Sequence, residues 1–156
     1  MHYIEQSQAV RVVGLELRTS NAEAASTIPA FWQHVGRQGL IAQVQGLLAA
    51  WQGQPAPIEV FAVYTHFEHA GVDNDGLYSL IVGIQVPADF PLPANMVHAV
   101  LPACRRAVFP VPNNDPQQVG AAWMTAWQAS DLPKAYVADC ERYGADGRIE
   151  IWVGLK

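Results

Sequence analysis

The 156-residue chain repeats one order of predicted elements twice, and this repeat constrains its fold more than any other sequence feature. Each half predicts a strand, a helix and a two-stranded hairpin, and a proline-rich linker at 87–95 separates the halves. A repeat of about 75–80 residues is too long for one unit of a solenoid. We therefore expect a single α+β domain over 1–156, with halves at about 9–86 and 96–156.

In the first half, residues 9–18 are apolar on both faces, so we expect a strand buried on two sides. Thr27 and Pro29 are typical of the cap and first turn of a helix. Its apolar stripe weakens at Gly36 and Gly39, where we expect the helix to end or bend. The other elements predicted here are short helical pieces over 40–51, a strand over 58–70, a turn over 71–76 and a strand over 77–86.

The second half follows the same plan. Asp115 is a natural N-cap, Pro116 a natural first helical residue, and Gln118 stands where a capping box needs it. An apolar stripe at helical spacing follows these residues. The other elements predicted here are a long or broken strand over 96–111, a strand over 135–143, a turn over 144–147 and a strand over 148–155.

Two such halves predict antiparallel sheets related by a pseudo-twofold axis, with the helices on one side. The repeat aligns Phe67 and Glu68 with Cys140 and Glu141, just before the hairpin turn of each half. We expect a ligand groove between the halves, because pockets favour such junctions.

Composition excludes several classes of protein. The net charge is −5, with 9 basic against 14 acidic side chains, whereas a duplex-binding protein needs lysine and arginine to displace counterions. No apolar run approaches the ~20 residues of a membrane helix, and the first residues lack the segments of a signal peptide. Cys104 and Cys140 are expected to be reduced thiols. We therefore expect a cytoplasmic protein with neither a direct nucleic-acid partner nor a membrane partner.

Two glutamates are candidates for a binding site. On a strand, Glu68 would share a face with Tyr64, and Glu141 would share one with Asp139 and Tyr143. A carboxylate in an aromatic pocket attracts a lipophilic cation through its charge, and the rings add cation–π contacts. A solvated glutamate near a turn is the alternative for each of them.

The tryptophans leave two interpretations open. Trp32, Trp123 and Trp127 have helical spacing, so they either pack in the core or line a pocket. Trp127 lies off the apolar stripe and is the better candidate for a pocket wall. The sequence predicts no metal site, because His66 and His69 would point to opposite faces of a strand. It contains no phosphate-binding or dinucleotide-binding motif, and we predict no cofactor and no catalytic residue.

The ordered segments resemble the GyrI-like effector-binding domains, which form the ligand-binding half of many AraC- and MerR-type multidrug regulators and also occur alone. Tyr64, Phe67 and Glu68, followed by Tyr78 and Gly83, are similar to a pattern of that family. VVGLELRTSN with IPAFWQHV resembles its first strand and helix, AAWMTAW its second helix, and DCERYGADGRIEIWVGLK its closing Glu-x-Tyr and strand.

The resemblance implies a pocket for hydrophobic, often cationic, small molecules. It implies a buried glutamate as counter-ion, which Glu141 matches best, with Glu68 as its pseudosymmetric partner. Arg106 and Cys104 stand where the family usually has Tyr and Gly, and a cation there would neutralise the site or change its preference. The ligand-binding residues expected on this basis are Glu141, Glu68, Trp123, Trp127, Trp32, Tyr64, Tyr78 and Tyr143.

The residues before position 9 are too few for a helix-turn-helix, so the chain resembles stand-alone members, including those carried on mobile gene cassettes of integrons. The expected function is a sensor or drug-sequestering protein for hydrophobic cations. One alternative is a GyrI-like hydrolase of strained electrophiles, with Glu141 as general base and Trp123 or Tyr143 stabilising a cation. An inhibitor that docks a protein, a haem-binding protein, and a homodimer or other protein partner also remain open.

Overall fold

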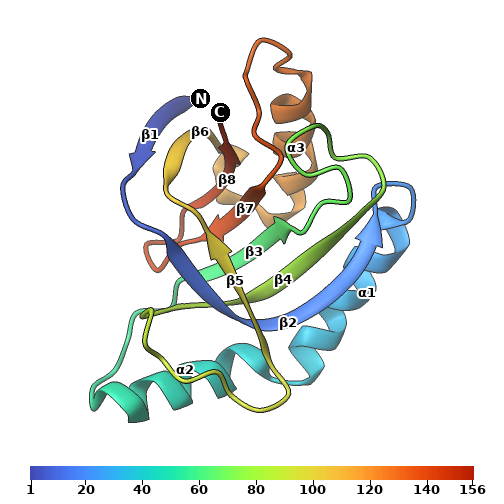
Figure 1. Cartoon of the computed structure of the whole chain (residues 1–156). Helices are drawn as coiled ribbons and strands as arrows, with labels where there is room; N and C mark the ends of the chain where they lie inside the picture. The colour runs from blue at the N-terminus through green and yellow to red at the C-terminus, as the bar shows by residue number, and fades with distance from the viewer.

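Eight strands form one antiparallel sheet in the computed structural model, which describes residues 1–156 (Figure 1). The strands are β1 (His2–Gln6), β2 (Val10–Ser20), β3 (Val60–Thr65), β4 (Leu77–Val86), β5 (Val97–Leu101), β6 (Cys104–Pro110), β7 (Ala138–Tyr143) and β8 (Ile149–Gly154). The α-helices are α1 (Ala24–Arg37), α2 (Leu40–Gln52) and α3 (Val119–Gln128). Short 3₁₀ turns at Pro112–Asn114 and Pro116–Gln118 precede α3.

The strand order confirms the predicted duplication. The order is β1-β6-β8-β7-β3-β4-β2-β5, so β3 and β7 meet at the centre and each half repeats the same arrangement outward. The edge strands are exchanged between the halves: β5 pairs with β2, and the N-terminal β1 pairs with β6. The pseudo-twofold axis therefore passes through the β3–β7 pair.

All three helices cover one face of the sheet, as the sequence predicts. Helices α1 and α2 pack with apolar side chains of β2, β3 and β4, and α3 packs with those of β6 and β8. Their buried positions, such as Phe31 and Val35 in α1, recur at helical spacing. Figure 1 shows α1 and α3 on either side of the end of the β3–β4 hairpin.

The other face of the sheet is an interior without helices. It holds a separate apolar cluster that includes Phe61, Val63 and Cys140. The sheet curls around this cluster until its two edges approach, and the side-chain amide of Gln6 in β1 donates to the Leu101 carbonyl of β5 at 3.0 Å.

Several boundaries differ from those the sequence predicts. Residues 40–51 belong to one continuous helix instead of short pieces. Helix α1 begins at Ala24, and Thr27 lies inside it, with its hydroxyl 2.7 Å from that of Thr19. Strand β3 ends at Thr65 instead of 70, because His66 has a φ of 51° that a strand cannot accommodate.

Other parts of the prediction are confirmed or extended. The hairpin strand over 77–86 has the predicted bounds, and the segment 96–111 is broken into β5 and β6. Asp115 caps the helical turn after it by accepting from the amide of Gln117 at 2.9 Å, without a capping box. Strand β1 was not predicted. No helix combines the length and the apolarity needed to cross a membrane.

Candidate ligand-binding site

A cavity of about 450 Å³ opens on the helix-covered face, between α1 of the first half and α3 of the second. Strands β3, β4 and β7 contribute its floor. Its lining is mainly apolar and aromatic, with three polar side chains. The apolar and aromatic part includes Ile28, Tyr64, Phe67, Tyr78, Trp123, Met124 and Trp127, and the polar part is Asn21, Asn74 and Asp139.

The aromatic rings form a continuous set of contacts. Trp123 and Trp127 lie one turn apart on α3 and stack, with centroids 6.0 Å apart and planes at 30°. Tyr64 and Trp123 form a T-shaped pair with centroids 5.1 Å apart, and the centroid of Tyr78 lies 5.7 Å from that of Tyr64. Phe67 continues the set at 6.0 Å from Tyr78. Such rings present electron-rich faces and a large apolar area to the cavity.

Glu141 is buried behind these rings with 3% of its surface exposed. Its Oε1 accepts hydrogen bonds from the Tyr64 hydroxyl at 2.7 Å and from the Trp123 indole at 2.9 Å. Its Oε2 accepts one from the Tyr143 hydroxyl at 2.7 Å. No arginine, lysine or histidine forms an ion pair with it. The protein therefore holds this carboxylate with neutral donors and leaves its charge without a counter-ion.

Burial and hydrogen bonding act in opposite directions on Glu141. Burial raises its pKa above the ordinary value, whereas the three donors oppose that rise. Burial, followed by the charge of Glu141, also raises the pKa of Tyr64 and of Tyr143, so both hydroxyls keep the protons that they donate.

Asp139 is a second carboxyl in the site, and our sequence interpretation did not select it. It lies two residues before Glu141 on the same face of β7, lines the cavity and is only 9% exposed. Its Oδ1 accepts from the backbone amide of Gly154 at 2.8 Å, and burial raises its pKa to about 6. The alternation of Asp139, Glu141 and Tyr143 was the available signal, because alternate residues of a strand share a face.

Two residues expected in the site form a layer behind it. Trp32 and Tyr143 form a T-shaped pair with centroids 5.7 Å apart, and neither residue lines the cavity. Tyr143 instead holds Glu141 from behind, so its connection to the cavity is indirect.

Glu68 is placed differently from the prediction. Because β3 ends at Thr65, Glu68 is exposed in the following turn, where its Oε2 accepts from the amide of Leu77 at 2.8 Å. Glu141, in contrast, lies within β7 opposite Ala62. Glu68 is therefore not the pseudosymmetric equivalent of Glu141, and it fixes the hairpin instead of lining the cavity.

The two departures from the expected pattern also lie outside the cavity lining. Arg106 is fully buried on the interior side of the sheet, where it donates to the carbonyls of Ala138 at 2.8 Å and Pro102 at 3.0 Å and to the side chain of Gln6. It forms no ion pair with Glu141. Cys104 is half-buried at the start of β6, and it and Cys140 are both free thiols.

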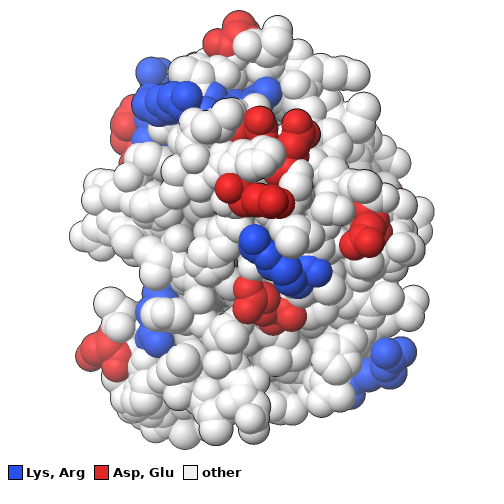
Figure 2. Space-filling model, turned by 45° about the vertical axis from the view of Figure 1, so that its right-hand side comes forward, with Lys and Arg blue, Asp and Glu red and all other residues white.

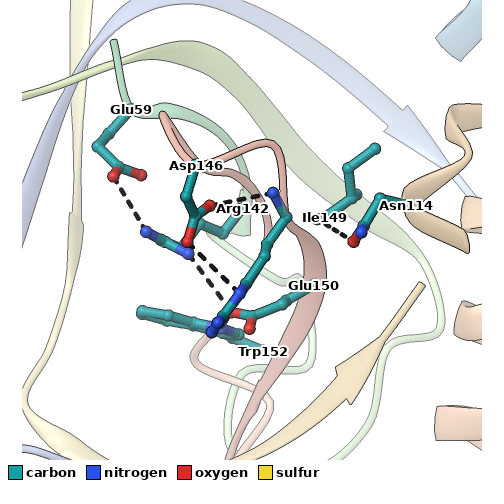
Figure 3. A network of polar contacts seen from close by, with 8 residues as sticks. Glu59, Asn114, Arg142, Asp146, Ile149, Glu150 and Trp152 are labelled. Carbon is teal, nitrogen blue, oxygen red and sulfur yellow. Dashed lines mark hydrogen bonds and ion pairs between the residues drawn. The ribbon is translucent and has the colours of Figure 1, made fainter. Parts of the chain in front are cut away.

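The remaining charged groups near Glu141 in sequence are engaged elsewhere. Arg142 points to the interior face, where it forms ion pairs with Glu59 at 3.0 Å and Glu150 at 3.6 Å (Figure 3). Trp152 donates to Glu150 in the same network at 2.9 Å. Alternation along β7 thus separates the arginine from the glutamate beside it in sequence.

The surface and the titratable groups indicate what this site can hold. Figure 2 shows charged side chains in small separate groups on an otherwise uncharged face. No three His, Cys, Asp or Glu side chains gather into a group that could hold a metal ion. The cavity combines a large aromatic area with a carboxyl group in its lining and a second one buried behind it.

Comparison with known proteins gives a family and a fold. Residues 1–156 match the sequence profile of a family described as the GyrI-like small molecule binding domain. No curated protein matches the chain. Among solved structures, an integron cassette protein from the mobile metagenome of Vibrio cholerae is similar, with 22% identity and a TM-score of 0.72 over 99% of this chain and 95% of that one.

Two further structures share the fold. A protein from Staphylococcus aureus MU50, described as a candidate for bacterial transcription regulation, has 18% identity and a TM-score of 0.67 over 100% of this chain and 99% of that one. The protein SAV2435, solved bound to tetraphenylphosphonium, has 17% identity and a TM-score of 0.67 over 100% of this chain and 94% of that one.

Proposed function

Because the chain belongs to the GyrI-like family of small-molecule binding domains, we propose that its cavity binds hydrophobic cations, with the buried Glu141 as their counter-ion. The observation that carries this proposal is the absence of any protein cation at a buried carboxylate beside an aromatic cavity. Burying a charge without a partner costs free energy, and a cationic ligand would offset that cost.

The aromatic lining supports the same class of ligand. The rings of Trp123, Trp127 and Tyr64 supply apolar area, and their faces supply cation–π attraction, which suits a cation whose charge is shielded by rings. The related fold of SAV2435 holds tetraphenylphosphonium, a cation of this kind. We propose that the chain acts in the cytoplasm as a sensor or a sequestering protein for such molecules.

The direct test is a titration with tetraphenylphosphonium beside the neutral triphenylphosphine oxide, followed through quenching of tryptophan fluorescence. The proposal expects saturable binding that prefers the cation. Glu141→Gln should weaken binding of the cation by about 5- to 100-fold, which corresponds to about 1–3 kcal/mol, and should spare the neutral compound. Glu68→Gln is the matched control, because its carboxylate lies outside the cavity lining. Equal losses for both ligands in Glu141→Gln would contradict the counter-ion role.

The hydrolase alternative uses the same carboxylate in another way. A general base must reach a water beside the ligand, whereas Glu141 is almost fully buried, does not line the cavity and is held by three protein donors. This arrangement favours electrostatic binding over proton abstraction. Product analysis after incubation with an electrophilic ligand separates the two functions, because only an enzyme consumes the ligand.

A further inference from the structure

We propose that Asp139 makes a second, direct anionic contact in the cavity, and that it selects cations carrying N–H groups, such as protonated amines, over quaternary cations. This inference rests on the proposed function, since it concerns the same cavity. It assigns the two carboxylates different tasks: Glu141 supplies buried charge, and Asp139 accepts hydrogen bonds from the ligand.

The hydrogen bonding of the two carboxylates differs. Glu141 has both oxygens occupied by protein donors and is not part of the cavity lining. Asp139 lines the cavity, and only its Oδ1 is occupied, by the amide of Gly154. The Oδ2 atom of Asp139 accepts no hydrogen bond from the protein. This Oδ2 atom is also not fully buried. The only fully buried side-chain nitrogen or oxygen without a hydrogen-bond partner is Glu59 Oε2, so Asp139 Oδ2 retains some exposed surface.

An acceptor of this kind distinguishes cations by their hydrogens. When a ligand fills the cavity, it displaces water from Asp139 Oδ2, and the lost hydrogen bond must be replaced. A protonated amine can donate an N–H to the carboxylate in a short, charge-assisted bond. A quaternary ammonium or phosphonium has the same charge but no such donor. A site with an unpaired polar group discriminates strongly against ligands that cannot satisfy it.

The position of Asp139 fits a ligand that also contacts the rings. Tyr64 lies directly opposite Asp139 in the β3–β7 ladder, and its hydroxyl reaches Glu141. The two carboxyl-bearing residues are separated by about 7 Å along the strand. An ammonium group at Asp139 would therefore remain within the field of Glu141 while its apolar part lies against Trp123 and Trp127.

The surrounding charges favour the ionised form of Asp139. Burial is the dominant influence and raises its pKa, whereas Arg106 on β6 and Lys134 before β7 act against that rise. Arg106 forms no ion pair with it, so the acceptor oxygen stays available to a ligand. With a pKa of about 6, the group is mainly ionised at pH 7.5.

The test uses three compounds with one carbon skeleton: 3,3-diphenylpropylammonium, its N,N,N-trimethyl derivative and the neutral 3,3-diphenylpropanol. Binding to the full chain is measured by calorimetry at pH 7.5. We expect the wild-type protein to bind the primary ammonium more tightly than the trimethyl compound. Asp139→Asn keeps an oxygen for the Gly154 amide and removes the charge. We expect it to weaken binding of the primary ammonium by roughly tenfold or more, and that of the trimethyl compound clearly less.

Asp131→Asn is the matched control, because it removes the same charge from an exposed loop residue outside the cavity lining. Failure of the wild-type protein to prefer either cation over the alcohol would overturn the proposed function itself. Equal losses of both cations in Asp139→Asn, or no loss, would overturn the selective role of Asp139 while leaving cation binding intact. If the variant does not fold, the wild-type comparison decides, and the absence of any preference for the primary ammonium contradicts the inference.

Discussion

The hydrogen-bond donors around Glu141 determine how much negative charge the site presents. Tyr64, Trp123 and Tyr143 each stabilise the ionised form by a hydrogen bond, and burial destabilises it. Three neutral donors keep the negative charge in place without cancelling it, whereas an arginine would cancel it. Under the proposed function, this choice of donors leaves the carboxylate free to attract a cationic ligand.

We expect Tyr64→Phe to raise the pKa of Glu141, because one of the bonds that favour its ionised form is lost. The variant should also bind tetraphenylphosphonium more weakly near neutral pH. NMR titration of the Glu141 carboxyl carbon measures the first effect, and fluorescence titration measures the second. Tyr143→Phe is the matched variant, since it removes a bond of the same length from outside the cavity. An unchanged Glu141 pKa in both variants would refute this account of the donors.

At the residue scale, the sequence located part of the site. Trp127 was favoured as a wall residue because it lies off the apolar stripe, and it lines the cavity, as do Tyr64, Tyr78 and Trp123. Glu68 was misplaced because one residue, His66, leaves the extended conformation and ends the strand before it. The role of Arg106 could not be predicted, since two of its three partners, Gln6 and Ala138, are distant from it in the sequence.

Among the elements, strands β2 and β4 approach each other most closely at a pair of glycines. Gly14 and Gly83 face each other in the ladder, and a Cβ atom built on Gly83 would lie 1.9 Å from the Val13 carbonyl oxygen. No side chain fits there without a shift of the backbone. The glycine in the hairpin pattern of the sequence is therefore required by strand packing.

We expect Gly83→Ala to lower the free energy of unfolding by about 1–3 kcal/mol or more, since the added methyl meets rigid backbone. Gly46→Ala is the control within α2, where a Cβ meets nothing within 4 Å. The control should stabilise the protein by up to about 1 kcal/mol through helix propensity. Urea denaturation of both variants measures the difference. A neutral Gly83→Ala would show that the sheet relaxes at this point more easily than the geometry indicates.

The sequence predicted element types better than element limits. The hairpin strand over 77–86 was correct, because turn residues and prolines bound it clearly. Of the long or broken strand expected over 96–111, the broken form is observed. Helix α2 was predicted as separate pieces, yet its buried residues Leu40, Val44 and Leu48 recur every four positions and hold it together. Strand β1 was missed because it pairs with β6, which lies far from it in the sequence.

Across the whole molecule, the curled sheet separates two kinds of environment. Its interior holds apolar side chains and the buried Arg106, and its outer face holds the helices and the cavity. Strand β7 contributes side chains to both environments, since Cys140 points into the interior and Asp139 and Glu141 point to the helix-covered face. The charge of Arg106 acts on Asp139 through this strand, so the interior influences the ionisation of the binding site.

The raised pKa of Asp139 predicts how stability depends on pH. Burial raises this pKa from 3.8 to about 6 against the opposing charges of Arg106 and Lys134. Tyr136 also lies within electrostatic range of Asp139. Well below pH 3.8 the group is protonated in both the folded and the unfolded chain, so it has no effect. As the pH rises to 6, the unfolded chain loses the proton first and is favoured. The contribution of Asp139 to stability therefore falls between about pH 4 and 6, by about 3 kcal/mol at most.

Asp139→Asn isolates this contribution, because the variant cannot ionise at that position. The unfolding free energy of the variant minus that of the wild-type protein should increase from pH 4 to pH 6.5 and then level off. Urea denaturation at a series of pH values measures this difference, and any constant cost of the substitution cancels from its slope. The Asp131→Asn control should show no such rise, since that residue is exposed. A difference independent of pH would mean that Asp139 ionises in the folded protein as it does in the unfolded chain, and that the cavity floor is better hydrated than its burial indicates.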